Sequence, residues 1–243
     1  MTFHRSLFIS CLLAVATSGA VAVDMARSTE PDAEVHFAEV CDGRINLVPK
    51  FGLRPKCKAL LDLDQAFLDL MDRDYDHDRR KASMAVSQRG WEHFRSGDID
   101  TGMKRFNQAW LLDSTNAVAI WGMGAIQGRK EQWQSALMLF DEARGLIGGN
   151  LRFRVDHARL LAVAGIELKN DQLLNRAFAA FDSIHRDVPQ DTANLQNWAM
   201  ALYMTGRIED AWSRLQEALR TPGAKMVSVE LINEIEARRT IAK

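Results

Sequence analysis

Residues 83–116, SMAVSQRGWEHFRSGDIDTGMKRFNQAWLLDSTN, decide the fold that we predict for this chain. The stretch divides at Ser96-Gly97-Asp98, a turn signal between two segments whose apolar residues recur at helical spacing. The same order of small and aromatic residues returns in the residues that follow, at a period of about 34 residues. A two-helix unit that recurs at this period predicts an array of helical hairpins.

Four such units are predicted, at residues 83–116, 117–150, 158–191 and 192–223. Each unit has one small residue where its two helices touch, a second small residue where hairpins stack, and one large apolar residue between hairpins. The first role falls to Gly90, Gly124, Gly165 and Ala199, the second to Gly102, Ala136, Ala177 and Ala211, and the third to Phe106, Phe140, Phe181 and Leu215. The extra residues 151–157 are predicted to lengthen the first helix of the third unit by about two turns.

This pattern resembles the tetratricopeptide repeat (TPR) family over residues 83–223. The resemblance implies an all-α fold, a right-handed α-solenoid of about four TPR hairpins. His93 stands where the family usually has a tyrosine that packs between helices, and Ser114 stands where a proline is usual.

Two flanking helices are expected to cover the ends of the array. The N-terminal entry helix begins near Lys58 within the segment 23–82. Its apolar stripe is Leu60, Leu61, Phe67, Leu68 and Met71. The C-terminal capping helix lies within residues 224–243. Its buried side is expected to be Met226, Val229, Ile232, Ile235 and Ile241.

The N-terminus predicts export. Residues 1–22 combine a charged start, a short apolar run and small residues, which is typical of a signal peptide cleaved near Ala22. The mature protein is then periplasmic or secreted, and Cys11 is lost with the leader. Cys41 and Cys57 remain, and in an oxidising compartment we expect them to form a disulfide that staples an otherwise irregular loop of about 15 residues.

No catalytic motif is present in the sequence. The alternating aspartates from Asp72 to Asp78 resemble the start of a calcium loop. However, His77 and Ser83 stand where that loop needs glycine and glutamate. Asp156 and His157 are neighbours whose side chains point apart on a helix. The sequence therefore predicts no enzyme, no cofactor and no metal site.

The TPR resemblance implies a concave groove lined by the first helix of each hairpin. The predicted partner-binding residues are Trp91, Phe94, Arg95, Trp121, Arg129, Arg159, Met200 and Tyr203, with Ser87 also on this face. Some family members clamp a carboxyl terminus here, but of the corresponding residues only Arg159 keeps that chemistry, so no such clamp is expected. On this interpretation Trp121→Ala would weaken binding with little loss of stability.

These residues predict a non-catalytic protein–protein interaction scaffold of the bacterial envelope that binds an apolar or helical segment of a protein partner. A docking subunit of an envelope enzyme or secretion complex is the alternative. The formal net charge of −1 does not favour nucleic-acid binding. Two other interpretations of the groove stay open: Trp91 and Trp121 pack between neighbouring hairpins, or the entry segment occupies the groove.

Overall fold

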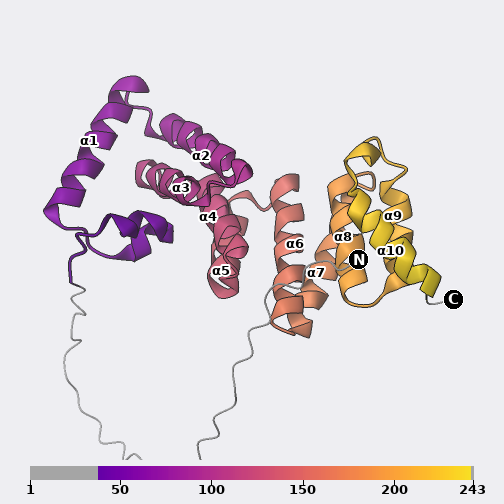
Figure 1. The fold of residues 1–243 in the computed structure, drawn as a ribbon. Coiled ribbons are helices and arrows are strands. Elements are labelled where there is room, and N and C mark those ends of the chain that lie inside the picture. The colour runs from indigo at the N-terminus through magenta and orange to yellow at the C-terminus, as the bar shows by residue number, and fades with distance from the viewer. Residues whose placement is uncertain (1–37, 242–243) are drawn as a thin grey trace, which may run out of the picture. The chain divides into compact units, whose positions relative to one another are not determined.

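The computed structural model describes residues 38–241, and this part of the chain contains ten α-helices and no strand (Figure 1). The predicted signal peptide lies outside the described residues. None of the described helices has the length and apolar character needed to cross a membrane. The helices are α1 (Lys58–Asp74), α2 (Arg79–Ser96), α3 (Ile99–Leu112), α4 (Ala117–Arg129), α5 (Trp133–Ile147), α6 (Leu151–Glu167), α7 (Asp171–Asp187), α8 (Thr192–Met204), α9 (Ile208–Ala218) and α10 (Val229–Ile241).

Helices α2 to α9 pack in consecutive pairs, α2 with α3, α4 with α5, α6 with α7 and α8 with α9. Each pair is a hairpin, and the described chain is an all-α solenoid of helical hairpins, as predicted. Side chains of asparagine or aspartate fix most of the helix starts, because their oxygen accepts a backbone N–H that has no partner within the helix. These N-cap residues are Asp78, Asp98, Asn116, Asn150, Asn170 and Asp191.

The small residues lie where the sequence pattern places them. A Cβ atom added to Gly90 would lie 2.6 Å from the Phe106 ring, and one added to Gly124 would lie 2.7 Å from the Phe140 ring. The alanines and large apolar residues of the pattern are also buried, with at most 2% of their surface exposed. These residues therefore lie at the helix contacts that the repeat pattern predicts.

The third hairpin differs from its prediction. Helix α6 has 17 residues, whereas α4 and α8 have 13 each, so the extension is about one turn rather than two. The cap at Asn150 starts α6 directly after Gly148-Gly149, with Phe153 donating its N–H to the cap at 3.0 Å. Helix α7 takes two more of the extra residues, with 17 residues against 15 in α5.

The capping helix α10 buries only part of the side that was predicted. Leu231 and Ile235 are buried, whereas Met226, Val229 and Ile241 are 77%, 62% and 81% exposed. A short 3-10 turn (Ala224–Met226) precedes α10, so Met226 lies outside the helix whose face it was expected to share. Helical periodicity identified Ile235 as buried, but with several apolar residues close together it did not identify Leu231.

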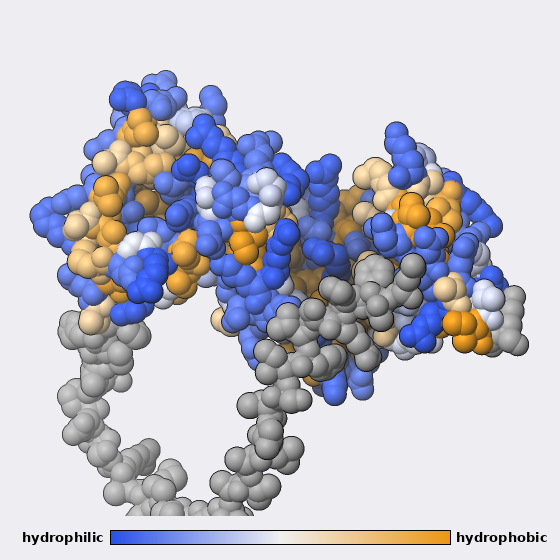
Figure 2. All heavy atoms as spheres, viewed as in Figure 1, coloured by the Kyte–Doolittle hydropathy of each residue, from blue (hydrophilic) through white to orange (hydrophobic). Residues whose placement is uncertain are grey.

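The entry helix α1 carries part of its predicted stripe inward. Met71 is buried and Phe67 and Leu68 are half-buried, but Leu61 is 53% exposed. Leu63 is 67% exposed as well. Figure 2 shows the resulting band of apolar surface along α1.

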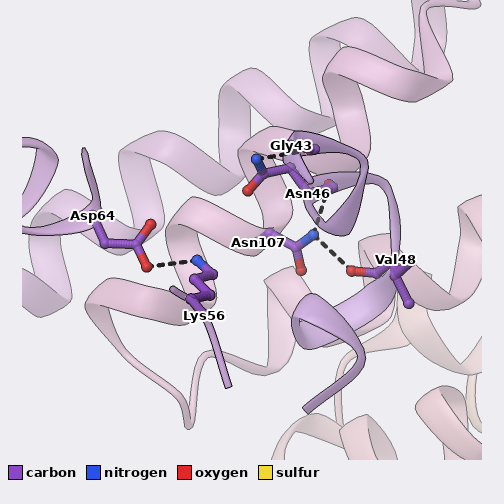
Figure 3. Close-up of polar contacts among 6 residues, drawn as sticks. All are labelled: Gly43, Asn46, Val48, Lys56, Asp64 and Asn107. Carbon is purple, nitrogen blue, oxygen red and sulfur yellow. Dashed lines mark hydrogen bonds and ion pairs between the residues drawn. The ribbon is translucent and has the colours of Figure 1, made fainter. Parts of the chain in front are cut away.

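The segment before α1 is compact rather than irregular. Cys41 and Cys57 form the expected disulfide, with their Cα atoms 5.3 Å apart. Between them lie two 3-10 turns, Gly43–Leu47 and Pro49–Leu53. The buried Asn107 of α3 holds both turns, donating its amide hydrogens at 2.8 Å to the backbone oxygens of Asn46 and Val48 (Figure 3).

Charged and aromatic contacts complete this docking. Lys56 pairs with Asp64 of α1 at 2.5 Å (Figure 3) and lies 3.2 Å from the centre of the buried Phe51 ring. The same ring meets Trp110 of α3 edge to face. The disulfide-stapled segment, residues 40–57, thus packs against α1 and α3.

Candidate partner-binding groove

Two adjoining hollows open between the first helices of the hairpins. Helix α2 packs against α4 and α6 packs against α8, whereas α4 and α6 lie further apart. The first hollow has a volume of about 470 Å³ and extends from α2 across α4 and α6 to the start of α8. The second, about 350 Å³, lies mainly between α4 and α6. Phe94 and Asp156 line both, so we treat the two hollows as one groove.

Aromatic side chains form the floor of the groove. The ring centroids of Trp91 and Trp121 are 4.7 Å apart, and Phe94 meets Trp91 at 5.4 Å. Trp121 also meets Phe153 of α6 at 5.7 Å. Such edge-to-face contacts hold large apolar rings in fixed positions, which is how a binding surface keeps its shape.

Both tryptophans contribute to packing as well as to the groove. Trp91 and Trp121 are half-buried and pack against the core of the first two hairpins. The expectation that Trp121→Ala leaves stability nearly unchanged therefore no longer holds, because truncating a partly buried tryptophan removes core contacts. Trp91 and Trp121 therefore both pack between hairpins and line the groove, so the two interpretations do not exclude each other.

Six of the eight predicted groove residues lie in the groove. Trp91, Phe94, Arg95 and Trp121 line the first hollow, and Phe94, Arg129 and Arg159 line the second. Of the described residues that precede Met84, none lines either hollow. The described entry segment therefore lies elsewhere, against α3.

Met200 and Tyr203 are not brought together with the other six. Met200 packs against the core of the last two hairpins, and the Tyr203 hydroxyl donates to Glu234 of α10 at 2.8 Å. The capping helix thus reaches Tyr203, which the TPR resemblance assigned to the groove. Ser87 is also misplaced, because it is fully buried and accepts a hydrogen bond from Asn116 at 2.9 Å.

Asp156 is a groove residue that the sequence analysis did not select. Burial raises the pKa of its carboxyl, while Arg159, the Trp121 indole and Arg152 act in the opposite direction. The Trp121 Nε1 atom is buried and makes no hydrogen bond of normal geometry with the described residues. A signal was available, because Arg152, Asp156 and Arg159 share one face of a helix at spacings of four and three residues.

His157 points away from Asp156, as expected for neighbours on a helix. Its ring stacks on Phe140 and lies beside Phe153, with both centroid distances 5.7 Å. Burial lowers the pKa of His157 to about 4, and the attraction of Asp141 only partly opposes this shift. His157 and Asp156 therefore do not form a pair in which one carboxylate orients a catalytic base.

The depressed pKa of His157 predicts a loss of stability in mild acid. Between the ordinary value of 6.5 and the folded-state value of about 4, the unfolded chain binds more protons than the folded chain. Stability is therefore complete above this window and falls as the pH falls through it. From pH 7 to pH 5 we expect His157 alone to lower the free energy of unfolding by about 2 kcal/mol.

The control for this prediction is His157→Phe, which keeps an aromatic ring between Phe140 and Phe153. Urea unfolding of both proteins at the two pH values isolates the contribution of the imidazole. The free energy of unfolding of His157→Phe minus that of the wild-type chain should be about 2 kcal/mol larger at pH 5 than at pH 7. Equal pH dependence of the two proteins would show that His157 does not titrate in this window.

Comparisons with known proteins add little to this description. No protein-family model matches the sequence, and no curated protein shows significant similarity to it. Similar solved structures include MamA, at 15% identity over 67% of this chain and 88% of that chain, with a TM-score of 0.47. Another is YrrB, described as a TPR protein with an unusual peptide-binding site, at 15% identity over 68% of this chain and 90% of that chain, with a TM-score of 0.45.

Similarity at this level carries no information about function. The architecture is instead established by the helix contacts within this chain. Consecutive helices pair as hairpins, and glycine, alanine and phenylalanine recur in phase at their contacts. The described part of this chain is an all-α solenoid of TPR-like helical hairpins.

Proposed function

We propose that this chain is a non-catalytic protein–protein interaction scaffold that binds an apolar or helical segment of a partner in the groove. The observation that carries the proposal is the groove floor, where Trp91 contacts both Phe94 and Trp121 and all three rings remain partly exposed. Tryptophan and arginine are the residues most enriched at binding hot spots, and α2 and α4 supply both. A hollow of this volume accommodates large apolar side chains of a docked segment.

The envelope is the proposed location. The Cys41–Cys57 disulfide supports an oxidising compartment, because such bonds persist in exported proteins and are rare in a reducing cytosol. The predicted leader, cleaved near Ala22, supplies the route. Together they support a periplasmic or secreted scaffold.

The second candidate is a docking subunit of an envelope enzyme or secretion complex with one dedicated partner. The two candidates differ in what the groove retains. A general scaffold binds many apolar segments weakly, whereas a docking subunit co-purifies with one protein at fixed stoichiometry. The exposed apolar band on α1, which includes Leu61 and Leu63, favours the second candidate by offering an additional contact surface.

Filling the groove tests the proposal. Ala125 lines the second hollow, so Ala125→Phe is expected to occupy it and to reduce partner retention at least tenfold in affinity capture from the native envelope. Ala179→Phe is the matched control, because Ala179 is exposed on α7 and lines neither hollow. Melting temperatures of both variants establish that they fold.

Two outcomes contradict the scaffold. One is that the wild-type chain retains no protein above background under gentle conditions. The other is that Ala125→Phe retains as much partner as the wild-type chain while melting at the same temperature.

A further inference from the structure

The groove is bordered by four arginines that lack carboxylate partners among the described residues. Arg95 and Arg152 line the first hollow, and Arg129 and Arg159 line the second. All four are exposed, and none forms an ion pair within the described residues. Elsewhere in the same structure, arginines such as Arg79 and Arg154 do pair with aspartates.

The carboxylates in the groove do not offset these cations. Only Asp156 and Asp191 line the two hollows, against four arginines. The Asp191 carboxylate caps α8, accepting the Asn194 N–H at 2.7 Å. Asp156 is partly buried, and burial raises the pKa of its carboxyl more than Arg159 and Arg152 lower it. The groove thus carries local positive charge in a chain whose formal net charge is −1.

The arginines come from three helices and are divided between the two hollows. Arg95 lies on α2, Arg129 on α4, and Arg152 and Arg159 on α6. The aromatic floor lies within the same two hollows. A segment that crosses the groove therefore meets cations in both hollows and apolar rings within them.

We propose that the groove recognises a segment in which a bulky apolar side chain is flanked on both sides by acidic residues. This inference rests on the function proposed above and specifies the partner. The apolar side chain occupies the aromatic floor, and glutamate or aspartate carboxylates pair with the arginines of the two hollows. Arginine suits this role because its planar guanidinium donates two parallel hydrogen bonds to a carboxylate.

A single-stranded nucleic acid also combines negative charge with flat apolar rings, but the groove favours it less. A phosphate backbone carries a negative charge at every nucleotide and so brings charge to Asp156 and Asp191, whereas a peptide with acidic residues at two points can place them at the arginines alone. Trp91 contacts Trp121 and Phe94 edge to face, and Trp121 also contacts Phe153 in this way. These rings are therefore already engaged by protein neighbours and are less available for bases to stack on.

The test begins with selection of peptides from a random library on the full wild-type chain. Ala125→Phe serves as counter-selection, so that only peptides that need the groove are kept. We expect aspartate and glutamate to be enriched on both sides of a large apolar residue. The selected peptides are then synthesised with blocked ends, which removes any contribution of a terminal carboxylate, and are titrated by tryptophan fluorescence.

Charge reversal provides the decisive comparison. The double variant Arg95→Glu/Arg159→Glu is expected to bind the selected peptide at least tenfold more weakly. The matched control, Arg89→Glu/Arg220→Glu, changes two exposed arginines that line neither hollow, and we expect it to bind within about twofold of wild type. Raising the salt concentration should weaken wild-type binding and leave the Arg95→Glu/Arg159→Glu variant less affected.

The inference is overturned if groove-dependent peptides show no acidic enrichment, or if both double variants bind alike. The proposed scaffold function survives that result. If no selected peptide depends on the groove, both the inference and the proposed scaffold function fail. Tighter groove-dependent binding of oligo-deoxythymidine than of any selected peptide would also overturn the inference, in favour of nucleic acid.

Discussion

Replacing Gly122 with alanine is expected to lower the free energy of unfolding by about 3 kcal/mol. The added Cβ atom would lie 2.2 Å from Cζ of Phe106 and 2.3 Å from its Cε1. The ring cannot move away, because it is fully buried and Gly90 of α2 contacts it from another helix. The overlap must therefore separate α4 from the first hairpin, and urea unfolding measures the cost.

The control is the same substitution at Gly145. No atom lies within 4 Å of a Cβ added there, and the residue is exposed on α5. Gly145→Ala should raise stability by roughly 0.5–1 kcal/mol, because alanine favours the helix. Adding Phe106→Leu to Gly122→Ala should recover part of the loss, since the two sites touch and their effects are not additive. If Gly122→Ala and Gly145→Ala changed the free energy of unfolding by the same amount, α4 would not pack on Phe106.

Loss of the Cys41–Cys57 disulfide is expected to destabilise the segment 40–57 by a comparable free energy. The bond joins residues 16 positions apart, and closing a loop of this length stabilises the folded segment by about 3 kcal/mol in the chain-entropy model. In Cys41→Ser/Cys57→Ser, the segment 40–57 should dock less firmly on α3. Backbone amides of that segment, such as Ile45 and Val48, should then exchange hydrogen faster, by up to about 100-fold.

Exchange in α7 to α9 provides the internal control for this prediction. The buried residues of those helices belong to a separate core cluster and should keep their protection, because repeats contact mainly their neighbours. Adding a reductant to the wild-type chain should reproduce the effect without any substitution. Unchanged exchange at Ile45 and Val48 under both treatments would show that the contacts of Asn107 and Lys56 hold the segment without the bond.

The sequence predicted the hairpins because their contacts depend on residue size at fixed positions. Gly90, Ala136 and Phe140 are buried where the repeat pattern places them, since helices approach closely only over small side chains. The length of α6 was less predictable. The helix begins at Leu151, the first of the extra residues, but it ends at Glu167, and the exact end of a helix is not specified by its apolar period.

The groove was predicted in part, because its residues depend on contacts between hairpins and flanking segments. Trp91 and Trp121 fall on the expected side, but Tyr203 bonds to Glu234 of the capping helix. His93, expected between helices, is 37% exposed and lies 3.3 Å from Asp98. Asp156 enters the groove because α4 and α6 stand apart, and that spacing is not encoded in any single repeat.

Site-specific photo-crosslinking in the native envelope tests the central claim, that a partner docks in the groove, most directly. The photoreactive residue replaces Gln88, which is exposed and lines the first hollow, or its neighbour Arg89, which is exposed and lines neither hollow. We predict a covalent adduct with a partner protein from position 88 that is absent from position 89 and is lost when Ala125→Phe is added. Adducts from position 89 alone, or adducts from position 88 that persist in Ala125→Phe, would place the partner on another surface and contradict the account.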